Sequence, residues 1–76
     1  MVHAFIMVDT AAGKSQNLLD AVTGFDTVEE AHIVAGDYDI VVEADAEEVY
    51  EILQTASSEV QGLDGVVDTK TYIAID

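Results

Sequence analysis

The chain has no cysteine, no arginine and only two lysines among its 76 residues. Without cysteine it can form neither disulfide bridges nor zinc–thiolate sites, which often support domains of this size. Lys14 and Lys70 stand against 16 acidic residues, so the net charge is −14. Because affinity for nucleic acids rests mostly on lysine and arginine contacts with phosphates, we expect no direct binding to DNA or RNA.

Long hydrophobic runs are also absent from the sequence. No apolar stretch approaches the roughly 18 residues needed to span a membrane, and Met1-Val2-His3 lacks the basic region of a signal peptide. We therefore expect a cytoplasmic protein with no membrane partner. Half of the residues are nevertheless hydrophobic, which favours a single folded domain over residues 1–76 and argues against a disordered acidic chain.

The excess of acidic residues is typical of proteins from extreme halophiles. Such a surface repels itself over a Debye length of about 10 Å at 0.1 M salt, but over only about 3 Å at 1 M salt. An ordinary acidic protein is the alternative interpretation. If the chain is halophilic, most of its carboxylates keep it soluble, and composition alone assigns no function to any one of them.

Hydrophobic periodicity predicts four strands and two helices in the order β-α-β-β-α-β. The predicted elements are strands at 2–8, 28–35, 38–44 and 66–75, a first helix at 14–23, and a second helix between Asp45 and Gly62. Gly24 is expected to end the first helix in a left-handed conformation. Asp45 and Glu48 are expected to form the capping box of the second helix. One face of that helix is expected to be apolar, with Val49, Ile52, Leu53, Ala56 and Val60.

This order of elements predicts an α+β, ferredoxin-like sandwich. Right-handed crossovers place both helices on one face of a four-stranded antiparallel sheet and leave the other face open. The first three predicted strands are too apolar for that open face to be fully hydrated. We therefore expect a homodimer that forms through the open sheet face, with a larger assembly such as an octamer as a further option.

The predicted hairpin of residues 31–45 carries the strongest functional signal. Its tip, Gly36-Asp37-Tyr38-Asp39, combines turn chemistry with two carboxylates and a phenol. Gly36 is expected to supply a positive φ angle. The remainder of the chain has no cysteine nucleophile, serine–histidine–aspartate arrangement or phosphate-binding loop.

The hairpin resembles a signature of the effector-binding domain (RAM domain) of the Lrp/AsnC family of transcription regulators. The resemblance rests on residues 31–40, and it is supported by Leu63-Asp64-Gly65-Val66 before Thr69-Lys70-Thr71 and by Ala4-Phe5-Ile6. Full-length members also carry an N-terminal helix-turn-helix. This sequence begins directly at the first strand, so it resembles a stand-alone RAM domain without a helix-turn-helix.

The resemblance implies a non-enzymatic regulatory module that binds a free amino acid or a similar small metabolite between subunits. Full-length Lrp/AsnC relatives are then further partners. By this resemblance the ligand contacts six residues of the hairpin tip and the last strand: Gly36, Asp37, Tyr38, Asp39, Thr69 and Thr71.

The chemistry of these residues suits an amino acid. Asp37 or Asp39 could bind the ammonium group through charge-assisted hydrogen bonds. Backbone N–H groups of the tip, with the hydroxyls of Thr69 and Thr71, could bind the carboxylate. Tyr38 offers an apolar wall with a polar end.

Each assignment has a structural alternative. Asp37 could simply bond its own backbone in the turn, Asp39 could fix the tip or an interface, and Thr69 and Thr71 are good strand formers. We expect neither a cofactor nor a bound metal, because Asp37 and Asp39 alone supply too few oxygen ligands for Mg²⁺.

Two other functions stay open at this point. A purely structural oligomerisation module would explain the apolar strands equally well. A small dimeric enzyme of the same fold, such as a monooxygenase or an isomerase, would need a general acid or base active near neutral pH. His3 and His32 are the candidates for that role.

The halophile interpretation makes a direct prediction. We expect the melting temperature to fall when KCl is lowered from molar concentration to about 0.1 M, because screening of the acidic surface is lost. Circular dichroism in a KCl series measures this. A melting temperature that does not respond to salt would remove the interpretation.

Overall fold

The structure, a computed structural model, describes residues 1–75. The elements along the chain are β1 (Val2–Thr10), α1 (Ser15–Val22), β2 (Val28–Ile33), β3 (Ile40–Ala46), α2 (Val49–Gln54), η1 (Thr55–Val60) and β4 (Val66–Ile73). The segment η1 is a short π-helix that continues α2 without a break. The predicted order of strands and helices is confirmed, and the strand ends differ from the prediction by at most two residues.

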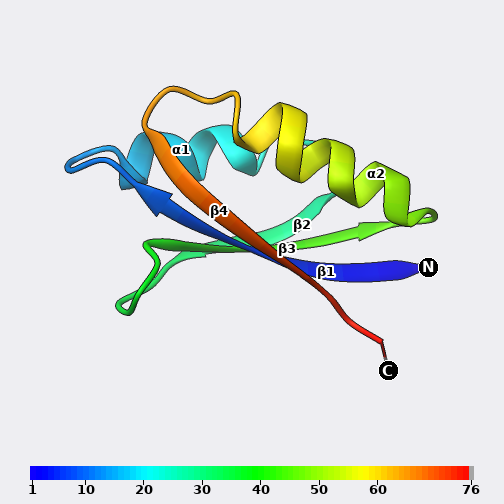
Figure 1. The fold of residues 1–76 in the computed structure, drawn as a ribbon. Helices are drawn as coiled ribbons and strands as arrows, with labels where there is room; N and C mark the ends of the chain where they lie inside the picture. Colours follow the sequence, from blue (N-terminus) through cyan, green and yellow to red (C-terminus); the bar gives the residue numbers. More distant parts are fainter. Residues whose placement is uncertain (76) are drawn as a thin grey trace.

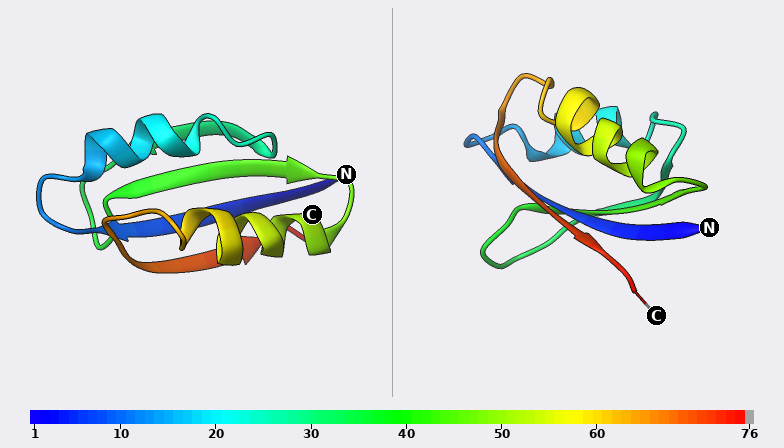
Figure 2. Two further views of the ribbon diagram at one scale, coloured as in Figure 1. Left: turned by 90° about the horizontal axis from the view of Figure 1, so that it is seen from above. Right: turned by 45° about the vertical axis from the view of Figure 1, so that its right-hand side comes forward.

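The four strands form one antiparallel sheet in the order β2-β3-β1-β4. Both helices lie on the same side of this sheet, and the other side carries no element among residues 1–75 (Figures 1 and 2). This is the α+β, ferredoxin-like sandwich that the sequence predicts. We call the uncovered side the open face.

The core lies between the helices and the sheet. Strand residues alternate between the two faces, so every second residue of the central strands β1 and β3 points toward the helices. The fully buried core residues with the largest side chains are Ile6, Val8, Val22, Ile40, Val42, Ile52 and Val60. On α1, Leu18 and Val22 are buried and Leu19 is partly buried against the core.

The start of the second helix differs from the prediction. The capping box is formed by Glu48 and Glu51, and the Glu48 backbone N–H donates to the Glu51 carboxylate over 3.1 Å. The predicted box of Asp45 and Glu48 is wrong, because β3 continues through Ala46. Asp45 instead pairs with His3 of the neighbouring strand.

The buried face of the second helix also differs from the prediction. Ile52, Ala56 and Val60 are buried as predicted, whereas Val49 and Leu53 are about half exposed. The wider π turn changes the angular spacing of residues and brings Thr55 into the core. No helix among residues 1–75 combines the length and apolar character needed to cross a membrane.

Two glycine predictions are wrong. Neither Gly24 nor Gly36 has a positive φ; the glycines that do are Gly13, at +79°, and Gly65, at +98°. The first helix ends with Thr23 in the right-handed region, so no left-handed residue is needed there. At Gly65 an added Cβ would lie 3.0 Å from Lys14 Cγ, so both the backbone angle and the space favour glycine.

The connection between the two strands of the hairpin is longer than a tight turn. Strand β2 ends at Ile33 and β3 begins at Ile40, so residues 34–39 form the connection. This 34–39 loop projects from the sheet away from the helices, at the lower left of Figure 1. It carries four of the six predicted site residues, namely Gly36, Asp37, Tyr38 and Asp39.

Candidate ligand-binding site

Hydrophobic side chains occupy the centre of the open face. Phe5 and Met7 of β1 lie opposite Tyr72 of β4 and Val41 of β3, respectively, in the strand registers. Phe5, Met7 and Val41 are partly buried, and Tyr72 is 52% exposed. We call these four residues the open-face patch.

The 34–39 loop and this patch border an open hollow of about 520 Å³. Its lining consists of three patch residues and five consecutive loop residues: Met7, Val41, Tyr72, Val34, Ala35, Gly36, Asp37 and Tyr38. The hollow is mostly apolar, with a single carboxylate from Asp37 and two phenol groups. Its volume lies within the roughly 300–1,000 Å³ of small-molecule sites.

The structure therefore brings together three of the six predicted site residues. Gly36, Asp37 and Tyr38 line one hollow, whereas Asp39, Thr69 and Thr71 do not line it. The sequence reasoning missed Met7, Val41 and Tyr72. The alternation of side chains along the last strand could have identified Tyr72, because it places Tyr72 on the opposite face of the sheet from Thr69 and Thr71.

Asp39 serves as the anchor of the loop. Its carboxylate accepts hydrogen bonds from the Thr10 backbone N–H, over 2.8 Å, and from the Thr10 hydroxyl, over 3.2 Å. Its backbone N–H donates to the Val8 carbonyl over 2.9 Å, and its carbonyl accepts from the Val34 N–H over 2.8 Å. These contacts support the alternative in which Asp39 fixes the tip.

Thr69 and Thr71 lie on the face of β4 that the helices cover. They pair in register with Val8 and Ile6, two core residues of β1. The Thr69 hydroxyl accepts a hydrogen bond from the Gln61 amide over 2.7 Å. Within one copy of the chain these hydroxyls therefore point away from the hollow.

Three carboxylates gather where the loop joins the sheet. The pKa of Asp9 is raised by desolvation first, then by a hydrogen bond with Asp39 and by the negative charges of Asp39 and Asp68. The pKa of Asp39 is lowered, chiefly because the Thr10 backbone N–H bonds its charged form. Asp39 therefore keeps its charge to lower pH, and Asp9 is the first of the pair to take up a proton as the pH falls.

A second hollow, of about 450 Å³, lies on the helix side between the 24–27 segment and the second helix. Its lining is polar and includes Asp26, Glu51 and Glu59. The hydroxyls of Thr27 and Thr55 are hydrogen-bonded to each other over 2.7 Å. None of the predicted site residues lines this hollow.

The two histidines lie on the open face but outside both hollows. They are not on adjacent strands, since β3 separates β1 from β2. A hydrogen bond with Asp45 is the main cause that raises the pKa of His3, and Glu43 adds to it. The structure therefore places neither candidate general base in the lining of either hollow.

The comparisons with known proteins agree with this geometry. The family description "Lrp/AsnC ligand binding domain" matches residues 3–76. The chain belongs to this family. A comparison with curated proteins gives no match.

Solved structures of similar length share the fold of this Lrp/AsnC ligand-binding domain. The protein TTHA0845 from Thermus thermophilus is 28% identical, with a TM-score of 0.96 over 100% of this chain and 95% of that chain. The protein FFRP-DM1 is 32% identical, with a TM-score of 0.92 over 99% of this chain and 100% of that chain.

Longer regulators contain the same fold. E. coli AsnC is 22% identical, with a TM-score of 0.90 over 99% of this chain and 51% of that chain. A transcriptional regulator from Neisseria meningitidis, solved as a complex with L-Met, is 17% identical, with a TM-score of 0.86 over 99% of this chain and 50% of that chain. This Lrp/AsnC domain thus spans about half the length of these two regulators.

The opposite pKa shifts of Asp9 and Asp39 predict how the stability of the fold depends on pH. Because the pKa of Asp9 is raised in the folded state, its charge destabilises the fold at neutral pH, and acidification relieves this cost. Because the pKa of Asp39 is lowered, its contribution stabilises the fold above about pH 4, the ordinary aspartate value, and is lost as the pH falls through its folded-state pKa. We expect Asp9→Asn to raise the melting temperature at pH 7.

The same variant should also gain less stability than the wild type when the pH falls from 7 to 4, since its amide is already neutral. Melting curves at both pH values, in molar KCl, measure this. Glu47→Gln is the matched control, because Glu47 is an exposed acid outside the cluster. If both variants shift the melting temperature equally, the Asp9–Asp39 interaction does not influence stability.

Proposed function

We propose that the chain is a non-enzymatic regulatory module that binds a free amino acid, or a similar small metabolite, in the hollow beneath the 34–39 loop. The observation that carries this proposal is the convergence of Gly36, Asp37 and Tyr38 with the open-face patch. The family assignment supports a ligand-binding role. The complex of the Neisseria regulator with L-Met supports an amino acid as the ligand class.

The lining can supply what an amino acid needs. The exposed carboxylate of Asp37 can accept hydrogen bonds from the ammonium group. Backbone N–H groups at Gly36 and Tyr38 can donate to the ligand carboxylate. Met7, Val41 and Tyr72 form an apolar wall, which suits a hydrophobic side chain better than a charged one.

A second copy of the chain would close this hollow. The open-face patch adjoins the hollow and has no cover among residues 1–75, and burial of such a patch favours association. We propose that two copies associate through this face. Asp39 would then act as a positioning residue. Thr69 and Thr71 lie on the other face of β4, so a copy bound at the open face would not bring them to this ligand.

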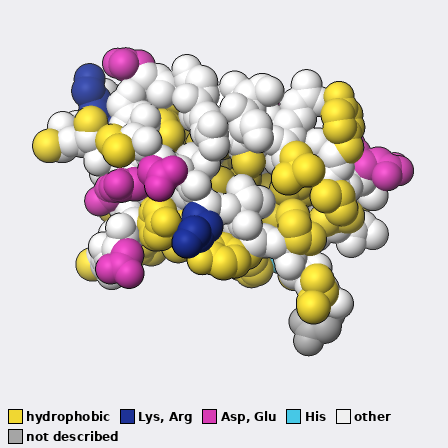
Figure 3. Space-filling model, viewed as in Figure 1, with side chains coloured by type: hydrophobic (Ala, Val, Ile, Leu, Met, Phe, Trp, Pro, Cys, Tyr) yellow, Lys and Arg dark blue, Asp and Glu magenta, His cyan; other side chains and the backbone are white. Residues whose placement is uncertain are grey.

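Further hydrophobic side chains are exposed beyond the open face. They include Val49 and Leu53 of α2 and Val67 of β4, and hydrophobic side chains gather on the side of the molecule that presents these two elements (Figure 3). They offer contacts for an assembly larger than a dimer. Full-length Lrp/AsnC relatives are the partners through which such a module would affect transcription, since the net charge of −14 opposes direct contact with DNA.

The ligand proposal is tested by calorimetric titration with each of the twenty amino acids in multimolar KCl. We expect at least one of them to bind. Asp37→Asn should weaken that binding about tenfold or more, because loss of a charge-assisted hydrogen bond costs about 1.5–3 kcal/mol.

Asp64→Asn is the matched control, since Asp64 is an exposed aspartate that does not line the hollow. It should bind as the wild type does. A folded preparation that releases no heat with any amino acid would leave the chain as a purely structural oligomerisation module.

The interface proposal is tested by the molar mass in solution. We expect Tyr72→Asp to reduce the mass measured by light scattering, because it buries a charge against the partner's apolar patch. Ser57→Asp introduces the same charge at an exposed residue of η1 on the helix side, outside the patch, so the molar mass should stay that of the wild type. A folded Tyr72→Asp variant of unchanged mass would contradict an interface at this face.

A further inference from the structure

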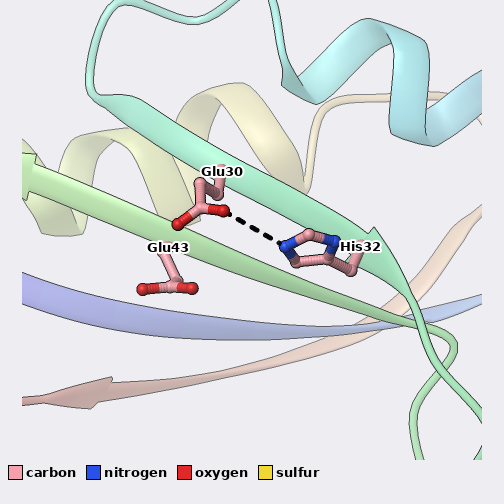
Figure 4. A group of neighbouring side chains, drawn as sticks. All are labelled: Glu30, His32 and Glu43. Carbon is pink, nitrogen blue, oxygen red and sulfur yellow. Dashed lines mark ion pairs between the residues drawn. The ribbon is translucent and has the colours of Figure 1, made fainter.

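Three side chains that can bind metals meet on the open face, at the edge of the sheet away from β4. Glu30 and His32 come from β2, and Glu43 comes from β3 (Figure 4). One ligand atom from each lies within 4.8 Å of the others. His32 Nε2 is 3.4 Å from a Glu30 carboxylate oxygen.

An irregularity in β2 creates this arrangement. The register shifts between Val28 and Glu30, so that Val28 pairs with Ala44 and Glu30 pairs with Glu43. In regular alternation Val28 and Glu30 would lie on the same face. The bulge lets Val28 pack against the core while Glu30 points to the open face beside His32. Bulges often redirect side chains next to functional sites.

The resulting pair of carboxylates is unfavourable by itself. Like charges directly opposite each other on neighbouring strands destabilise a sheet, and Glu30 lies opposite Glu43 in the register. A cation held between the two carboxylates would remove this repulsion. The high negative charge of the chain also raises the local concentration of cations.

His3 extends the cluster on the other side of Glu43. Its Nε2 is 3.4 Å from a Glu43 carboxylate oxygen, and its Nδ1 is hydrogen-bonded to the Asp45 carboxylate. The imidazole ring also packs edge-on against Phe5, with the ring centroids 5.0 Å apart. A carboxylate that holds one ring nitrogen while the other faces a ligand set is the usual outer-shell arrangement of metal-binding histidines.

We infer that Glu30, His32 and Glu43 form a binding site for a divalent transition-metal ion such as Zn²⁺, with His3 as the fourth ligand and Asp45 orienting it. The mixture of imidazole nitrogen and carboxylate oxygen suits Zn²⁺ and its neighbours in the first transition row, whereas Mg²⁺ and Ca²⁺ prefer oxygen ligands alone. Two carboxylates also match the charge of a divalent ion.

For Glu30, His32 and Glu43, metal binding requires only small side-chain movements. Ligand atoms around a tetrahedral zinc ion lie about 3.4 Å apart, given bonds of about 2.1 Å, and one ligand atom from each of these three residues already lies within 4.8 Å of the others. His3 Nε2, which is 3.4 Å from a Glu43 carboxylate oxygen, would have to turn toward the same ion. The side chains of His32 and Glu30 are about 60% exposed and can rotate toward an ion. None of the proposed ligands lines the hollow beneath the 34–39 loop, so the metal site and the proposed amino-acid site can be tested separately.

The test is calorimetric titration of the full chain with ZnCl₂, and separately with MgCl₂, at a salt concentration at which the chain is folded. We expect one Zn²⁺ per chain and no comparable binding of Mg²⁺. His32→Gln should weaken Zn²⁺ binding by at least about tenfold, since even outer-shell changes cost about 10–100-fold in metal affinity. Circular dichroism checks that the variant is folded.

Glu59→Gln is the matched control, because it removes an exposed carboxylate from η1 and leaves the open face intact. It should bind Zn²⁺ as the wild type does. As a second measurement, Co²⁺ added to the wild type should give the visible absorption bands of inner-sphere coordination by imidazole. Equal weakening in both variants, equal binding of Mg²⁺, or no Zn²⁺ binding by the folded wild type would overturn the assignment.

Discussion

The central strands β1 and β3 carry hydrophobic side chains on both faces, and the two helices can cover only one of them. On the covered face, Ile6, Val42 and their neighbours form the core. On the open face the same strands leave Met7 and Val41 against solvent. The proposals of a two-copy interface and of a ligand in the adjoining hollow both depend on this imbalance, because a small domain has few other ways to bury apolar surface.

The 34–39 loop turns that open face into a concave surface. Asp39 ties the loop to the end of β1 through Thr10 and Val8, which leaves Asp37 free of this network. The two aspartates of the tip thus have different parts: one holds the loop in place, and the other offers its carboxylate to the hollow. Their separation illustrates why an acidic residue in so acidic a chain is assigned a function only after its contacts are known.

Several acidic residues of the open face lie beside histidines of neighbouring or the same strands. Glu43 and Asp45 alternate along β3 and meet His3 across the strand pair, and the bulge in β2 adds Glu30 and His32. These charged residues lie beside the apolar patch on the same face. The open face therefore combines an apolar centre with a histidine–carboxylate edge, and each supports a separate binding proposal.

The sequence by itself determined the order of the elements and the division of each strand into two faces, because hydrophobic periodicity is local and reflects which side is buried. It also located Gly36, Asp37 and Tyr38 at the hairpin tip. Only the tertiary structure decided that Asp39 bonds Thr10, 29 residues away, and that Tyr72 completes the hollow while Thr69 and Thr71 face the helices. The bulge at Glu30 and the π turn at Thr55 likewise depend on packing between distant segments, which no local pattern of residues encodes.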